Sequence, residues 1–427
     1  MKEKDIDQMT QRERADYEFA HRFDEAEAVM GKPAADALRR LYDFYGTEWL
    51  DWLASLYDPN TGALYYANSS RDSDEFLPDC ESTAQAISMI EYFGGLRYCG
   101  GDHNEAYPKV MRDKCVEFIR SLQSNVDGYF YHPQWGSDIG PARRGRDLNQ
   151  CLAILKKFDA APPYPTALER LSGGSDEERR VLPAYLLSRE AMLEYLEKLD
   201  INHKSHMMGH NISSQNNQIV AAGLAEFVCK YINERQNPDT GLWEDEANYS
   251  TLSGVVKVGS ALEGLGSYVH YGDKIVDSAM DVILSDVAPI WIIYIFNPWG
   301  GFGKAIEGAA IAEREALARG ETPAYSVKSI REKIYARLPE LIDKTIEKLA
   351  MFKKPDGSFS YEPHRSQPRT QGVPVSLGED EGDVNGLACA MHYTLRSIIA
   401  VLGIKHIPLI STEDFLRFRG KLEEAHK

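Results

Sequence analysis

Apolar residues recur at three- and four-residue steps along most of the chain. The segment 36–57 shows this clearly, because Leu38, Leu41, Tyr45 and Leu53 return at helical spacing. Such a period is typical of amphipathic α-helices, and no long stretch has the alternation typical of strands. The fold class is therefore predicted to be all-α. About thirteen helices are expected by this criterion, near 10–30, 36–57, 80–95, 106–122, 148–158, 183–199, 215–235, 251–270, 273–285, 303–319, 325–352, 384–402 and 411–424.

Four turns of related sequence separate these helices. Each has Asp or Asn before a glycine and an aromatic residue after it, in the stretches 58–65, 125–130, 237–243 and 354–359. The Asp or Asn side chain starts such a turn, and the glycine takes the positive φ. The aromatic residue is expected to pack the turn back onto the helices. Four copies of one arrangement predict a structural repeat.

A polar group follows three of these turns and opens the next helix. The stretches are Asp79-Cys-Glu-Ser, Asp147-Leu-Asn-Gln and Asp383-Val-Asn-Gly. Aspartate at such a place caps a helix and complements its dipole. The helices that follow are rich in small residues, which suits close packing. A polar cluster is predicted at the N-terminal ends of buried helices, with helix capping as the alternative role for each carboxylate; the candidate substrate-binding residues are Asp79, Glu81, Asp147, Asn149 and Asn385.

Paired helices, Asp-Gly-aromatic turns and acidic helix starts together resemble the α/α-toroid superfamily. Terpenoid cyclases, protein prenyltransferase β-subunits and many toroidal carbohydrate-active enzymes belong to it. The stretch from Gln236 to Trp243 is similar to the Q…W turn repeat of the terpenoid cyclases. The resemblance implies an (α/α)6 toroid of about six helical hairpins with its active site at one mouth. It further implies an N-terminal helical extension, 1–34, before the toroid, 35–427.

The catalytic signatures of the cyclases and prenyltransferases do not match. The strings nearest to a DxDD acid are 72–75 and 79–82, and neither fits. Cys389 and His392 have helical spacing without the neighbours of a zinc site, so we interpret them as a core cysteine beside a helix-surface histidine. The six cysteines form no CxxC pair and are expected to be reduced. The glycine-rich stretch 297–303 is interpreted as a loop without nucleotide-binding spacing. No metal and no cofactor are expected.

The densest polar stretch is 203–218, which carries three histidines and several amides before the predicted helix 215–235. Toroidal polysaccharide lyases neutralise a uronate carboxylate with Asn or Gln and Arg, and His or Tyr moves the protons. By that likeness His210, Asn211 and Tyr249 are candidate catalytic residues. A solvated loop capped by Ser213 or Ser214 is the alternative. Metal binding by the histidines would need a helix here, and Gly209 is interpreted as evidence against one.

A second candidate set is built on carboxylates and aromatic residues. Asp383 follows a long loop and could join another helix-start carboxylate in the acid/base pair of a glycosidase. His364 and Arg365 in that loop are candidates to clamp an anionic group. Tyr131, Trp135 and Trp243 are candidates to contact sugar rings, and aromatic faces suit carbocations equally well.

The amino-acid composition excludes some classes of binding partner. The 427 residues carry 65 acidic against 48 basic side chains, a net charge of −17. This charge argues against nucleic acid and anionic membranes as partners, but not against an anionic small substrate in a basic pocket. No secretory signal is visible, and the longest apolar run is shorter than the ~20 residues of a membrane span. A cytoplasmic location and a small-molecule or oligosaccharide substrate are predicted, and the oligomeric state is left open.

Three functions remain open at this point. The preferred one is a carbohydrate-active enzyme that cleaves an acidic oligosaccharide in the central cavity, as a lyase by β-elimination or as a glycoside hydrolase. The second is a terpenoid-cyclase-like enzyme, which predicts an aromatic cavity with one acid of raised pKa. The third is a non-catalytic toroid that binds a ligand or a protein partner.

Overall fold

The architecture is seen in a computed structural model, which describes residues 6–166, 185, 188–213, 216–323 and 325–427. Within these ranges the chain is almost entirely helical. Its strands there are the two-residue pair β1 (Arg369–Thr370) and β2 (Val373–Pro374), joined antiparallel. The all-α prediction is confirmed. No helix in the described part of the chain is long and apolar enough to span a membrane.

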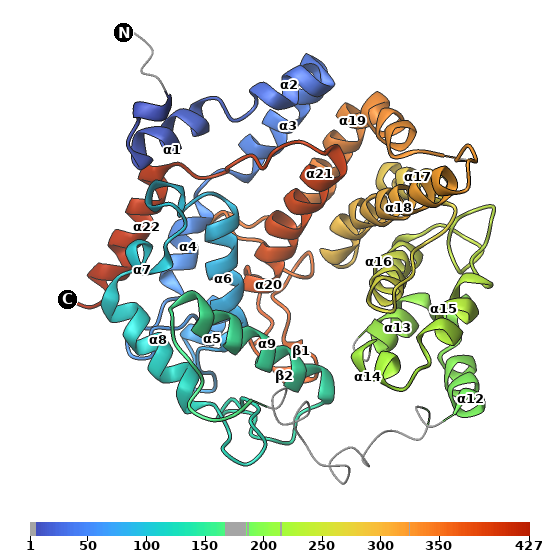
Figure 1. Ribbon diagram of the computed structural model, residues 1–427. Coiled ribbons are helices and arrows are strands. Elements are labelled where there is room, and N and C mark those ends of the chain that lie inside the picture. Colours follow the sequence, from blue (N-terminus) through green and yellow to red (C-terminus); the bar gives the residue numbers. More distant parts are fainter. Residues whose placement is uncertain (1–5, 167–184, 186–187, 214–215, 324) are drawn as a thin grey trace.

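Six helical segments form an inner ring in chain order (Figure 1). They are α6 (Cys80–Tyr92), α9 (Pro141–Lys157), α13 (Ile201–Ser213), α16 (Tyr249–Gly264), α18 (Ile293–Ala318) and the run of α20 (Val384–Leu387), η4 (Ala388–Tyr393) and α21 (Thr394–Leu402). Contacts link α6 to α9, α13 to α16, α16 to α18, α18 to α21, and η4 to α6. Helices α9 and α13 follow each other around the ring (Figure 1), and burial, Lys257 and Arg146 of α9 lower the pKa of His210 of α13.

An outer layer of helices alternates with the inner ring. It consists of α3 (Lys32–Tyr45) with α4 (Trp49–Ser55), α8 (Lys109–Ser121), α12 (Arg189–Leu199), α15 (Ala225–Asn233), α17 (Gly272–Leu284) and α19 (Val327–Leu349). Among them α19 packs on α3 and α17, and α8 packs on the inner helix α9. This alternation is that of an (α/α)6 toroid, and the prediction of that fold is confirmed.

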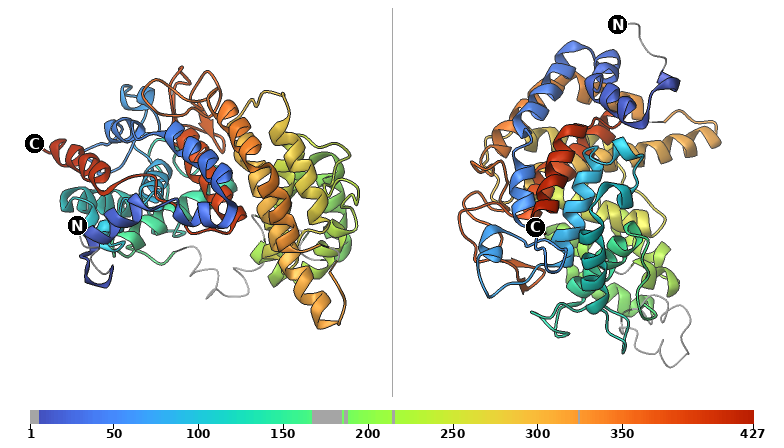
Figure 2. Two further views of the ribbon diagram at one scale, coloured as in Figure 1. Left: turned by 90° about the horizontal axis from the view of Figure 1, so that it is seen from above. Right: turned by 90° about the vertical axis from the view of Figure 1, so that its left-hand side faces the viewer.

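Shorter elements cover the ends and edges of the two layers. They are η1 (Ile6–Gln8), α1 (Gln11–Ala20), α2 (Asp24–Met30), α5 (Asn68–Arg71), η2 (Arg97–Cys99), α7 (His103–Ala106), α14 (Asn216–Ala221) and α22 (Thr412–Glu424). Helix α1 packs on η2 and on the C-terminal α22, while α2 packs on α3. The C-terminal part of α18 projects beyond its neighbours (Figure 2). The division at residue 34 stays a prediction.

The four predicted turns share one backbone pattern. In the first, the Gly62 amide donates to the Asp58 carbonyl and the Asp58 amide donates to the Ala63 carbonyl. The same pairs recur in 124–129 and 237–242, and 354–358 has them one residue shorter. A Cβ on Gly62 would lie 2.5 Å from the Cys115 amide of α8, and one on Gly241 would lie 2.7 Å from the Ile275 amide of α17. Glycine therefore lets the turns of Gly62 and Gly241 touch the backbone of the next outer helix. The shared hydrogen-bond pattern of the four turns confirms the repeat.

Some helix predictions are wrong in detail. The segment 36–57 forms two helices, because Gly46 has φ +63° and ends α3. The predicted helix 215–235 is interrupted between α14 and α15, where Gly223 has φ +70°; Gln215 lies outside the described residues.

The glycine-rich stretch 297–303 is helical rather than a loop, since it lies inside α18. Its glycines meet α16: a Cβ on Gly300 would be 2.9 Å from Val256, and one on Gly301 would be 3.2 Å from Leu252. These positions need small residues because two inner helices pack closely there.

Candidate functional site

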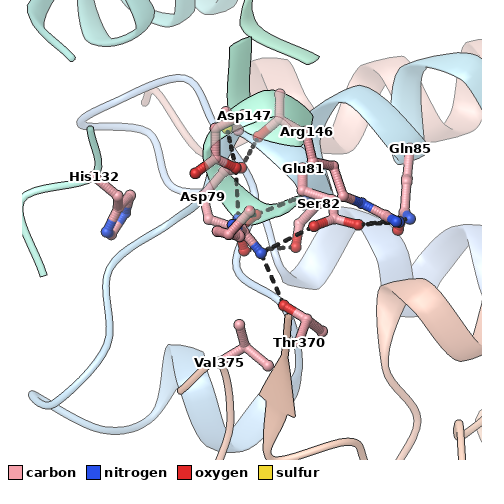
Figure 3. A network of polar contacts seen from close by, with 12 residues as sticks. Asp79, Glu81, Ser82, Gln85, His132, Arg146, Asp147, Thr370 and Val375 are labelled. Atoms are coloured by element: carbon pink, nitrogen blue, oxygen red, sulfur yellow. Dashed lines mark hydrogen bonds and ion pairs between the residues drawn. The ribbon is translucent and has the colours of Figure 1, made fainter. Parts of the chain in front are cut away.

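Buried charges form a network where α6 and α9 begin (Figure 3). Asp79 caps α6 by accepting from the Ser82 amide at 2.9 Å. Arg143 places one nitrogen 2.9 Å from a Glu81 oxygen and the other 2.9 Å from Asp147, with Asp79 at 4.0 Å. None of these four charged side chains is more than 4% exposed. Arg143 therefore ties the two inner helices together through their carboxylates.

Burial and the neighbouring charges shift the pKa values of these residues in opposite directions. Burial disfavours the charged form of Arg143, but Glu81, Asp147 and Asp79 outweigh it and raise its pKa. For Asp147 burial outweighs the attraction of Arg143 and raises the pKa to about 6. Asp147 therefore titrates close to neutral pH.

Arg146 lies at the edge of this network that is nearest to the middle of the ring. Glu81 pairs with Arg146 as well as with Arg143, and 35% of the Arg146 side chain is exposed against 4% of Glu81. Gln85 donates to Glu81 at 3.3 Å and to Asn385 of α20 at 3.2 Å, which fixes the carboxylate from the other side. Arg146 is thus a guanidinium held in place by a buried carboxylate and accessible over about a third of its surface. Such a group is suited to bind an anion.

Three further nitrogen groups lie on α13 and α16, and all are half-buried: Lys257 and His210 are near Arg146, and His206 is near those two. Burial and Arg146 lower the pKa of Lys257. Burial, Lys257 and Arg146 lower the pKa of His210, while burial, Lys257 and His210 lower that of His206. We call Arg146, Lys257, His206 and His210 the cationic cluster. Its members disfavour one another's charge, so a bound anion would relieve the repulsion.

Glycine allows α13 to approach α16 closely enough to form this cluster. A Cβ on Gly209 would overlap the backbone at Lys257 and Val258, and one on Gly254 would overlap the Ser205 hydroxyl. The interpretation of Gly209 as evidence against a helix is therefore wrong, and so is the solvated-loop alternative for 203–213. The residue removes the side chain that would keep the two helices apart.

Two tyrosines complete the surroundings of Arg146. Tyr393 ends η4, and burial raises its pKa to about 12 although Arg146 acts in the opposite sense. Burial also raises the pKa of Tyr361, again against the effect of Arg146. Both hydroxyls are therefore protonated at neutral pH and can act as proton donors.

Asp383 fixes the backbone next to these tyrosines. It is fully buried, caps α20 through the Gly386 amide at 2.7 Å, and accepts from the Tyr361 amide at 2.8 Å and the Gln367 amide at 3.2 Å. Burial raises its pKa to about 6. The carboxylate thus holds the Tyr361 backbone, and this geometry favours the capping role over a catalytic one.

The structure brings several predicted residues together and leaves others apart. Asp79, Glu81, Asp147 and Asn385 belong to the buried network, and Trp135 lies under Arg143 with 4.4 Å between guanidinium and ring. His210 belongs to the adjoining cationic cluster.

Other predicted residues have different partners. Asn149, His364 and Arg365 are exposed, and Arg365 pairs with Glu362 at 2.9 Å. Trp243 is 2% exposed and donates to the Ile232 carbonyl, which places it in the core.

The last three predicted site residues donate side-chain hydrogen bonds to groups close to them. The Tyr131 hydroxyl donates to Asp127 at 2.6 Å, the Tyr249 hydroxyl to the Val287 carbonyl at 2.7 Å, and the Asn211 amide to the Met207 carbonyl at 2.8 Å.

Sequence reasoning missed Arg143, Arg146, Lys257 and Tyr393. Two signals were present. Arginines at the start of a helix oppose its dipole, so Arg143 and Arg146 need a separate explanation. Lys257 is the one charged residue between Tyr249 and Leu262, in an otherwise apolar and small-residue helix.

Within the described ranges, no group of three or more His, Cys, Asp or Glu residues is placed to hold a metal ion. Cys389 is 3% exposed and His392 is 9% exposed. The interpretation of His392 as a helix-surface residue is therefore wrong, since its ring packs in the core against Tyr92, with 4.8 Å between ring centroids.

The inner and outer rings and the polar centre define an all-α toroid with a charged site. No protein-family model matches the chain, and no curated protein matches its sequence. Among solved structures it is similar to a glycoside hydrolase family 15 glucoamylase from Hypocrea jecorina, with a TM-score of 0.39 and 12% identity over 89% of this chain and 74% of that chain. At these values the similarity is a distant structural resemblance.

Proposed function

We propose that the protein binds an acidic oligosaccharide at the centre of its inner ring and cleaves it by β-elimination. The observation that supports this is the cationic cluster, four nitrogen groups gathered in a chain whose net charge is −17. A uronate carboxylate between Arg146 and Lys257 would neutralise their mutual repulsion. Arg146 is the fixed partner, because the buried Glu81 already orients it.

The neighbouring groups suit the proton transfers of this reaction. In β-elimination a base removes the proton next to the carboxylate, the bond to the leaving oxygen breaks, and that oxygen is protonated. His210 has a lowered pKa and is neutral at pH 7, as a base must be. Tyr393 or Tyr361 would supply the proton to the leaving oxygen. Arg146 and Lys257 would stabilise the charge that develops on the carboxylate.

Hydrolysis is the second candidate, because burial raises the pKa of Asp147 to about 6, in the range of a general acid. Its carboxylate is 2% exposed and faces Arg143, so it would need to become accessible. The polar centre does not favour a terpenoid cyclase, for which an aromatic lining is expected. A non-catalytic toroid would bind an acidic oligosaccharide at the same cluster without altering it.

Product analysis tests these alternatives. The protein is incubated with a panel of uronate-containing oligosaccharides, and new reducing ends are counted beside the ultraviolet absorbance of a conjugated double bond. Equal yields of both support elimination. Reducing ends alone indicate hydrolysis, and neither product across the panel contradicts the proposal.

A matched pair of variants locates the chemistry. His210→Gln is expected to lower the rate of cleavage by a factor of about 100 or more, because a general base is lost. The control His203→Gln changes an exposed residue of the same helix that pairs with Asp200, and it should leave the rate unchanged.

A further inference from the structure

An aromatic surface begins where α16 and α18 start. Trp291 is 38% exposed, whereas Trp49, Trp52, Trp243 and Trp299 are at most 5% exposed. Its ring centroid lies 5.3 Å from that of Tyr294, which stacks on Tyr249 at 5.2 Å and 4°. We call Trp291, Tyr294 and Tyr249 the aromatic platform, in which Tyr249 is 7% exposed and supports the other two rings from the core. It is unusual because a large, flat apolar side chain is left accessible to solvent.

The platform is held in a fixed position. The Tyr249 hydroxyl donates to the Val287 carbonyl at 2.7 Å, and the Ile292 amide donates to the Tyr361 carbonyl at 3.0 Å. The segment that carries Trp291 is therefore attached on both sides to the ring. Such attachment lowers the entropy that is lost when a ligand binds.

The platform is continuous with the cationic cluster. Tyr361 joins them, because its carbonyl accepts from the Ile292 amide beside Trp291 and its amide donates to Asp383, the cap of α20. Asn385 of α20 is linked through Gln85 to Glu81, the partner of Arg146. Arg146 pairs with Glu81 in the first turn of α6, and Tyr249 and Tyr294 lie in the first turns of α16 and α18. A ligand anchored at Arg146 therefore reaches the platform along the same end of the ring.

We propose that the aromatic platform is a subsite for a sugar ring next to the one whose carboxylate binds the cationic cluster. The inference rests on the proposed function. The C–H face of a pyranose packs on an aromatic ring without any need for charge. This subsite would therefore accept a neutral or an acidic sugar, whereas the cluster requires an anion.

Tryptophan fluorescence and kinetics test the subsite. Titration with oligogalacturonates is expected to change the emission of the wild-type protein and to leave that of Trp291→Phe nearly constant. For a longer oligogalacturonate, Trp291→Ala should raise KM about tenfold with kcat little changed, while Trp291→Phe keeps a ring and stays close to wild type. Binding of the monosaccharide galacturonate, which fills only the cationic cluster, should be alike in the two variants. Leu317→Ala, which changes a residue 70% exposed near the other end of α18, is the control.

The outcomes separate this subsite from the proposed reaction. Cleavage with an unchanged KM in Trp291→Ala overturns the subsite and leaves the reaction intact. A Trp291-dependent fluorescence change without any cleavage supports the subsite and contradicts the reaction. Self-association of the wild type that Trp291→Ala abolishes would show that the platform is an interface between copies of the chain, and would also overturn the subsite.

Discussion

At the scale of single residues, the central feature is that one buried carboxylate serves two arginines. Glu81 pairs with Arg143 and Arg146, so Glu81→Gln leaves two guanidiniums without their main partner. We expect a loss of about 3–5 kcal/mol in the free energy of unfolding, measured with denaturant. The control Glu362→Gln breaks an exposed pair with Arg365 and should cost at most ~1 kcal/mol. Equal losses in both variants would contradict the role given to Glu81.

The pH dependence of cleavage also belongs to the residue scale. His210 acts as a base only when neutral, and its pKa is lowered from 6.5 by burial, Lys257 and Arg146. The specificity constant kcat/KM should therefore begin to fall only at a pH below 6.5, where His210 gains its proton. On the alkaline side it should fall as Lys257 loses its proton, at a pKa lowered from 10.5 by burial and Arg146.

Lys257→Arg is the informative variant for this profile. Arginine keeps its charge to a pH above 12, so the alkaline fall should move upward while the acid fall stays in place. An alkaline fall that does not move in this variant would mean that Lys257 does not bind the anion.

At the scale of elements, the close packing of α13 against α16 positions His210 and Lys257. Gly209→Ala places a methyl group into the backbone of α16, and we expect a loss of about 2 kcal/mol in unfolding free energy together with weakened activity. Gly303→Ala is the matched control, since a Cβ there meets nothing within 4 Å. That change should raise stability by up to ~1 kcal/mol, because alanine favours a helix. Similar effects of the two substitutions would refute the packing argument.

The elements also show where prediction from the sequence succeeds and where it fails. Helical periodicity and the four turns are local, so the all-α class and the repeat were predictable from residue spacing. The role of Gly209 was not, because it depends on α16, far along the chain. Arg146 and Lys257 were missed for a similar reason: the sequence marks each as unusual for its helix but does not show that the ring brings the two near each other. Asp79 and Glu81 were found because helix starts carry a local signal, whereas the prediction that Asp147 starts a helix is wrong, since α9 begins at Pro141.

At the scale of the whole molecule, buried ionisable groups act on stability in opposite directions. Burial lowers the pKa of His392 from 6.5 to about 4, so the unfolded chain binds its proton first and the residue costs stability as the pH falls below 6.5. Asp147 and Asp383 have pKa values raised to about 6, so the folded state binds their protons first and gains stability over the same range.

Comparison of His392→Gln with the wild type isolates the histidine contribution. From pH 7 to pH 5 the wild type should lose about 2 kcal/mol relative to the variant, as measured by urea unfolding at each pH. A difference between the two proteins that is independent of pH would show that His392 is not held neutral in the folded state.

The central claim is that the middle of the ring recognises an anionic sugar through Arg146. Calorimetric titration with one uronate oligosaccharide and with its carboxyl-reduced counterpart tests this most directly. The wild type is predicted to bind the acidic form at least about tenfold more tightly, because an ion pair with a fixed guanidinium forms only there. In Arg146→Gln the two forms should bind alike. Equal affinity of the wild type for the acidic and the reduced oligosaccharide would contradict the claim.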